Sequence, residues 1–167
     1  MQLSRRDLCV LLPGVILPAA LFADALAAQT TAAPPAEPNM DTAPANFDPP
    51  LIASGGYPFD QLPVHHTAAS DTRALFKGKL ATGEHVEVHE TTLPAGGSPH
   101  PPHHHLHSEM WLIREGTIEI TIDGKSTDIG PGSGGFVASM LEHGIKNIGA
   151  TPATYFVVAM GPTAGLV

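Results

Sequence analysis

The chain has 167 residues and a formal net charge of −8, with 16 acidic and 8 basic side chains. This length suits one domain, and the basic residues form no cluster of the kind that binds nucleic acid. Cys9 is the only cysteine, which excludes a disulfide framework and a cysteine-ligated zinc site. Any metal bound by this chain must therefore be held by histidine and carboxylate side chains.

Residues 1–27 resemble a twin-arginine export signal. The sequence SRRDLC at residues 4–9 carries the paired arginines, an apolar stretch follows over 8–22, and the small residues ALA at 25–27 suit cleavage after them. The apolar stretch contains two prolines and is shorter than the roughly 20 residues that span a bilayer. We therefore expect export to the periplasm in the folded state, without stable membrane insertion. If the signal is not cleaved, it becomes a membrane anchor.

Residues 28–50 are rich in alanine and proline and contain almost no large apolar side chains. Such a segment buries too little surface to offset its ordering entropy, so we expect a flexible linker. The remaining residues, 51–167, suffice for one compact core and are too few for two. They are expected to form a single domain.

Short strands account for the patterning of this domain, and long helical periodicity is missing. Apolar and polar residues alternate over 85–93 and over 117–124, and the second run ends in Asp123-Gly124, a hairpin turn signal. The continuous apolar run at 153–160 predicts a strand buried on both faces. Residues 57–80 are expected to add one or two strands. The pattern predicts an all-β, antiparallel sandwich or barrel.

A histidine-rich stretch, GGSPHPPHHHLHSEMWLIREG, occupies residues 96–116. On a strand, His103 and His105 would point to the same face, and Glu109 would join them from the next strand. His143, the only histidine further along the chain, is the candidate fourth ligand. Three imidazoles and a carboxylate suit Fe(II), Mn(II), Ni(II), Zn(II) or Cu(II) and leave positions open for water or substrate.

Two other interpretations of this stretch stay open. It is also typical of a low-complexity segment that sequesters metal without defined geometry. Simple alternation would instead place His105, His107 and Glu109 on one face. In the four-ligand arrangement His107, with His100 and His104, lies at the rim or supports a ligand, while the roles of His65 and His66 are open and both are expected at the surface.

The spacing of these residues resembles the two conserved motifs of the cupin superfamily. The first motif is matched at every defined position, namely Gly97, His103, His105, Glu109 and Gly116. In the second, Gly132, His143 and Asn147 are in register, whereas Ala138 replaces a proline and Met140 replaces a glycine. The turn before His143 therefore departs from the family pattern.

The resemblance covers roughly residues 84–160 and implies a small jelly-roll barrel with one divalent metal per chain. It implies His103, His105, Glu109 and His143 as the ligands, and a homodimer formed through edge strands. Because twin-arginine export carries folded proteins, we expect Fe(II) or Mn(II) to be loaded before export, with Ni, Zn or Cu as alternatives.

Strand parity also indicates side chains that would line a substrate pocket. Trp111, Ile113 and Phe136 are candidates for an apolar lining, and Met140 is expected near the site. Glu87 and His89, with His85, would be acid or base groups if their face of the strand is interior. A solvated polar face is the alternative for these three.

Three functions are compatible with the sequence. The first is a metal-dependent enzyme acting on a small molecule, most plausibly a dioxygenase, with decarboxylase or isomerase chemistry as alternatives at the same ligands. The second is a non-catalytic barrel that binds a small ligand. The third is a metal-binding protein of the cell envelope. Because no ligand of the motif is lost, we expect the enzyme.

Overall fold

The structure is a computed structural model that describes residues 48–165. The predicted export signal and nearly all of the predicted linker lie outside this range. Within it, no helix has the length and hydropathy required to cross a bilayer.

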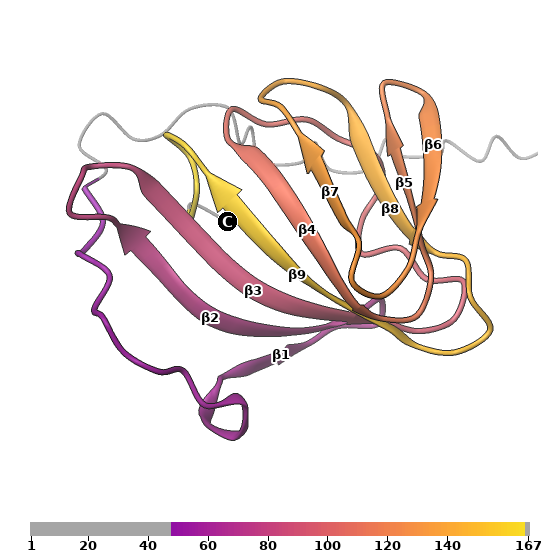
Figure 1. Ribbon diagram of the computed structural model, residues 1–167, viewed down its shortest axis with the longest axis horizontal. Helices are drawn as coiled ribbons and strands as arrows, with labels where there is room; N and C mark the ends of the chain where they lie inside the picture. The colour runs from indigo at the N-terminus through magenta and orange to yellow at the C-terminus, as the bar shows by residue number, and fades with distance from the viewer. Residues whose placement is uncertain (1–47, 166–167) are drawn as a thin grey trace, which may run out of the picture. The chain divides into compact units, whose positions relative to one another are not determined.

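The described residues form two antiparallel sheets (Figure 1). Six strands in the order β1-β2-β3-β9-β4-β7 make the larger sheet, and β6-β5-β8 make the smaller. A short 3-10 helix, η1 (Phe59–Gln61), precedes the strands, which are β1 (Val64–His66), β2 (Asp71–Lys79), β3 (His85–Leu93), β4 (Ser108–Glu115), β5 (Ile118–Ile122), β6 (Lys125–Ile129), β7 (Gly134–Val137), β8 (His143–Asn147) and β9 (Ala153–Met160). The predicted all-β, antiparallel jelly-roll architecture is confirmed.

Local sequence explains several of these elements. β3 coincides with the alternating run at 85–93, and β1 and β2 are the two further strands expected from 57–80. The hairpin between β5 and β6 turns at Asp123 (φ 47°) and Gly124 (φ 72°). Positive φ at both turn positions matches the right-handed twist of the strands, which is why an Asp-Gly pair is favoured there.

β9 differs from its prediction on one face. Ala153, Tyr155 and Val157 are buried, but Phe156 and Val158, on the other face, are only partly buried. The strand lies between β3 and β4 in the larger sheet; its inner face meets the core, while on its outer face Thr154 is buried and Phe156 and Val158 are partly covered. The expected burial of both faces is therefore met on the inner face and only in part on the outer one, because a central position in one sheet does not require a second covering layer.

The core fills the space between the two sheets and determines which side chains point inward. Trp111 and Ile113 of β4 are buried there, and strand parity places Glu109 on the same inward face. β8 contributes His143 and Ile145 in the same way. The candidate ligands therefore enter the barrel as a continuation of its apolar core.

Candidate metal centre

Backbone hydrogen bonds join the two parts of the chain that carry the candidate ligands. The amide of His103 donates to the carbonyl of His143 at 3.0 Å, and the amide of His143 donates to the carbonyl of His103 at 2.8 Å. This isolated bridge is the only ladder pairing of the loop 103–107 in the described residues. The expectation of a regular strand across His103 and His105 was thus wrong, although both imidazoles still approach His143.

The turn that leads into His143 is held in an unusual conformation. Met140 has a φ of 67°, in the left-handed region that favours glycine, and its amide donates to the carbonyl of His105 at 2.9 Å. This is the position at which the second motif has glycine. The methionine therefore adopts a backbone conformation that glycine would adopt with less strain.

Glu109, at the start of β4, points its carboxylate at the histidines. Its Oε1 lies 3.3 Å from Nε2 of His105 and 3.4 Å from Nε2 of His107, while Oε2 lies 3.7 Å from Nε2 of His143. The Glu109 side chain is only 16 % exposed. The structure therefore brings together His105, Glu109 and His143 as the sequence predicts.

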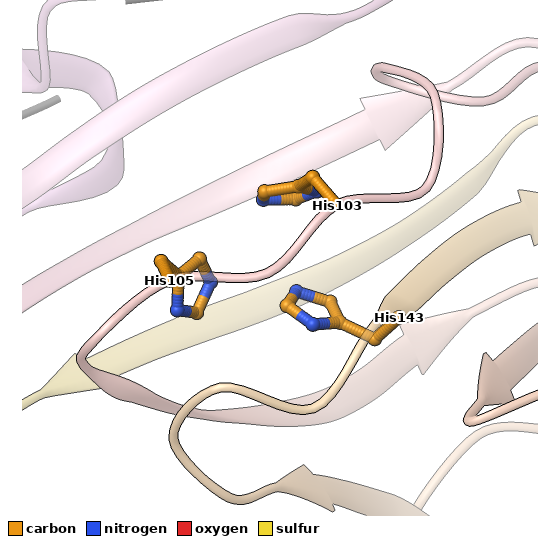
Figure 2. Close-up of side chains that lie close together, drawn as sticks. All are labelled: His103, His105 and His143. Atoms are coloured by element: carbon orange, nitrogen blue, oxygen red, sulfur yellow. The ribbon is translucent and has the colours of Figure 1, made fainter. Parts of the chain in front are cut away.

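The imidazole groups of His103, His105 and His143 face one another across a small space (Figure 2). Their candidate ligand atoms lie within 4.8 Å of one another. Bonds of about 2 Å to one ion place ligand atoms about 3 to 4 Å apart. A small contraction would thus suffice for all three to reach a common metal.

Hydrogen bonds to main-chain carbonyls fix which ring nitrogen is free. Nδ1 of His105 lies 2.8 Å from the carbonyl of His107, and Nδ1 of His143 lies 2.9 Å from that of Leu141. Since a carbonyl only accepts, each Nδ1 carries a proton, and in the neutral form of each ring Nε2 keeps its lone pair. Metal-binding histidines are commonly oriented in this way.

Three ring nitrogens of the cluster make no hydrogen bond of normal geometry in the protein, although two of them lie near the Glu109 carboxylate. Within residues 48–165, the buried side-chain atoms without a hydrogen bond are His103 Nδ1, His105 Nε2 and His143 Nε2. Leaving a buried polar atom unpaired costs about 1 to 3 kcal/mol, and here three such atoms belong to one cluster. A divalent cation would satisfy them, so the residues present fit the metal that the sequence implies.

Ring orientation distinguishes this cluster from the alternative set of His105, His107 and Glu109, whose ligand atoms are also close. An imidazole lone pair lies in the ring plane, so two rings share a metal where their planes intersect. The planes of His103, His105 and His143 cross at 50° to 68°. Those of His105 and His107 are stacked 3.5 Å apart at 12°. This geometry favours the predicted set and leaves His107 outside it.

Residues 89–159 match the family described as Cupin domain. Searching the curated proteins found no match.

The domain has a cupin fold. An RmlC-like cupin from Shewanella frigidimarina matches with 17% identity and a TM-score of 0.57, over 68% of this chain and 97% of that one. A predicted oxalate decarboxylase from Thermotoga maritima matches with 18% identity and a TM-score of 0.56, over 65% of this chain and 100% of that one. A sugar phosphate isomerase from Silicibacter pomeroyi matches with 16% identity and a TM-score of 0.52, over 65% of this chain and 76% of that one. The likeness to these structures shows the fold, and the family match covers residues 89–159, less than half of the chain.

Burial sets the protonation states in this cluster. It disfavours the imidazolium form and so lowers the pKa of His103 to about 4, and it lowers that of His143 as well. Burial opposes ionisation of Glu109, but the contacts with His105 and His107 outweigh it and hold the Glu109 pKa well below its usual range. For His105, burial is likewise outweighed by Glu109, which raises the pKa. Neutral His103 and His143 and an ionised Glu109 are the forms that bind metal.

The side chains predicted to line a pocket separate into inner and outer groups. Trp111 and Ile113 are buried in the core, and the ring of Trp111 lies 5.6 Å from that of His143. Phe136 is 57 % exposed and lies on the outer face of β7, because its neighbour Val137 points inward. Met140, on the turn, is 47 % exposed. The structure thus does not bring Phe136 to the ligands.

Glu87 and His89 lie on the inward face of β3. Their Cα partners on β9 are Ala159 and Val157, which are both buried in the interior. Nδ1 of His89 contacts both carboxylate oxygens of Glu87, at 2.8 and 2.9 Å. Of the two alternatives for this face, the structure supports the interior one, with the two groups paired to each other.

The sequence interpretation missed Thr163 and gave no structural role to Asn147. Thr163 is buried beside His107, and nothing in its local pattern marks it. Asn147 matched the second motif, but its role appears only in the structure. Its amide donates to the carbonyls of Leu93, Pro94 and Thr151 and thereby ties β8 to the loops around it.

Proposed function

We propose that this cupin is a metal-dependent enzyme that binds one divalent ion through His103, His105, Glu109 and His143 and acts on a small molecule as a dioxygenase. The observation that carries the metal is the group of three unpaired, buried ring nitrogens facing one another beside a carboxylate. A purely structural histidine cluster would be expected to pair these nitrogens inside the protein.

The donor set defines what the ion would contribute. Three neutral nitrogens and one carboxylate suit Fe(II) or Mn(II), and also Ni, Zn or Cu. When bound, the metal would supply Lewis-acid polarisation and open positions for substrate and dioxygen. Glu109 would lower the net charge of the site, and the carbonyl acceptors of His105 and His143 would hold both rings in place.

A cavity lined by residues of β5, the turn after it, β6 and β7 has the volume of a small-molecule site, and none of the candidate ligands lines it. Its volume is about 400 Å³, within the usual size of small-molecule sites, roughly 300 to 1,000 Å³. Ile122, one of its lining residues, is the Cα partner of His143 in the pairing of β5 with β8. The cavity is lined by Ile120, Ile122, Asp123, Lys125, Thr127, Ile129, Gly134 and Gly135.

The inward pair of Glu87 and His89 is the candidate acid or base of the reaction. Because Nδ1 of His89 lies against the Glu87 carboxylate, that carboxylate orients the ring and favours a proton on Nδ1. This arrangement leaves Nε2 of His89 as the atom that would accept or return a proton. We assign the pair this role within the proposed enzyme.

The reaction class is the less constrained part of the proposal. The matched folds include proteins described as an oxalate decarboxylase and a sugar phosphate isomerase, and one scaffold hosts many chemistries. Decarboxylation and isomerisation are therefore the alternatives to oxygenation at this site. The proposal also includes export to the periplasm and a homodimer, as expected from the sequence.

Oxygen uptake tests the enzyme directly. The purified protein, loaded separately with Fe(II) and Mn(II), is supplied with phenols, flavonols and small diketones in an oxygen electrode. We expect substrate-dependent uptake that His103→Ala abolishes and that His104→Ala, a change at an exposed neighbour, preserves. Tight one-to-one metal binding without turnover of any compound would contradict the oxygenase and favour a ligand-binding cupin.

A further inference from the structure

The segment after β9 turns back onto the metal cluster. Gly161 packs on His107, since a Cβ built at Gly161 would lie 3.3 Å from the Cα of His107. The amide of Gly161 donates to the carbonyl of His85 at 3.0 Å, and that of Ala164 donates to Gly161, also at 3.0 Å. We call residues 161–165 the C-terminal turn. It is attached to the same loop that carries the candidate ligands.

One side-chain contact connects this turn to the site. Oγ1 of Thr163 lies 2.8 Å from Nδ1 of His107, and both residues are buried, at 1 % and 2 % exposure. The other ring nitrogen of His107, Nε2, lies 3.4 Å from Oε1 of Glu109. Thr163, His107 and Glu109 thus form a continuous polar chain inside the barrel.

The chemistry of these three groups determines which atom donates the proton in each contact. An ionised carboxylate only accepts, so Nε2 of His107 must carry the proton that faces Glu109. Nδ1 of a neutral His107 then accepts, and the hydroxyl of Thr163 donates to it. The hydroxyl therefore selects the ring form in which His107 can hold the carboxylate.

We propose that Thr163 and His107 are positioning residues that orient Glu109 toward the metal, so that the C-terminal turn is part of the metal centre. His107 cannot join His105 as a ligand because the two rings are stacked. Its Nε2 instead fixes Oε1 on the side of His105, which leaves Oε2 directed at His143. The inference rests on the proposed metal site, and outer partners of metal ligands typically contribute about 10- to 100-fold in metal affinity.

The test compares Thr163→Val with Thr163→Ser in the full chain. Valine keeps the shape but removes the hydroxyl, whereas serine keeps the hydroxyl. Thr92→Val is the matched control, because this substitution also removes a hydroxyl contact, the one of 3.1 Å between Oγ1 of Thr92 and Oγ1 of Thr154 in the larger sheet. Cobalt(II) is titrated into each metal-free protein. The dissociation constant and the visible absorption spectrum are recorded, together with the melting temperature before metal is added.

Thr163→Val is expected to bind cobalt about 10-fold or more weakly and with an altered visible spectrum, while Thr163→Ser and Thr92→Val stay within about threefold of the unaltered protein. Unchanged affinity and spectrum in Thr163→Val would overturn the positioning role alone. Equal weakening in the valine and serine variants, tracking a lowered melting temperature, would also overturn it, because packing would then be the cause. If the unaltered protein binds no cobalt, the metal site fails and the positioning role fails with it.

Discussion

His103 and His143 exchange both backbone hydrogen bonds of a β-bridge, so the separation of these two candidate ligands is set by the main chain. Their side chains need no metal to be brought together. A site organised in this way loses little conformational entropy when a ligand binds. It also means that either imidazole can be removed by substitution without breaking the backbone contact that holds the loop to β8.

Met140→Gly tests the strain in the turn before His143. A left-handed conformation costs a non-glycine residue about 1 to 2 kcal/mol, while glycine loses more backbone entropy on folding, about 0.5 to 1 kcal/mol. We expect the free energy of unfolding to rise by up to about 1 kcal/mol, measured by urea denaturation. Met140→Ala keeps the strain and serves as the control. A glycine variant less stable than the alanine variant would contradict the strained assignment.

Asn147→Asp tests the role assigned to the second-motif asparagine. The Asn147 amide faces the carbonyls of Pro94 at 3.0 Å and Thr151 at 2.8 Å, and the residue is fully buried. A carboxylate there would face acceptors with no proton to donate, so we expect a loss of at least about 3 kcal/mol in unfolding free energy. The reverse exchange on the exposed strand β6, Asp128→Asn, should change stability by less than about 0.5 kcal/mol. Comparable stability of the two variants would rule out this role.

Arg114→Met tests an ion pair on the outer face of the larger sheet. Arg114 Nη1 donates at 2.7 Å to Oε2 of Glu90, whose side chain is 4 % exposed. Because Arg114 itself is 43 % exposed, most of the cost comes from the carboxylate left behind, about 1 to 3 kcal/mol.

Replacing both partners, as Arg114→Met with Glu90→Met, should recover most of that loss, since no buried charge then remains. Arg73→Met is the arginine control, because its guanidinium lies 4.3 Å from the Phe59 ring on the same face. Thermal denaturation of the unaltered protein, Arg114→Met, the double variant and Arg73→Met measures these changes in stability. A double variant no more stable than Arg114→Met would show that the unpaired carboxylate is not the cause.

Much of the fold followed from local sequence. Alternation located β3 and β5, and Asp123-Gly124 located the hairpin turn that leads from β5 into β6, because period-two patterning and turn chemistry act over a few residues. The outer faces were harder to predict. Phe136 is apolar yet exposed, and its position follows from Gly135 and Val137 facing inward, which composition does not reveal.

The part of the candidate site that depends on residue spacing was predictable from the sequence. The spacing of His103, His105 and Glu109 indicated a cluster, and the structure brings these residues to His143. The local conformation was not predictable by alternation, because Pro101 and Pro102 lack the amides that a strand ladder needs. Thr163 could not be found from sequence, since its contact with His107 joins distant parts of the chain.

The account rests on one metal ion held by a defined set of residues, and His143 is the residue that tests this best. A histidine-rich loop that sequesters metal would need only the residues between 100 and 107, whereas the proposed centre needs His143 of β8 as well. Removing the imidazole relieves an unpaired buried nitrogen and leaves a small cavity. These effects oppose each other, so His143→Ala should remain folded.

The decisive measurement is therefore the number of cobalt(II) ions bound per chain, and their affinity, in the unaltered protein and in His143→Ala. Circular dichroism establishes that both are folded. The account predicts one ion per chain in the unaltered protein and affinity at least about 100-fold weaker in the variant, as loss of one of four ligands requires. Two or more ions per chain, or undiminished binding in His143→Ala, would contradict it.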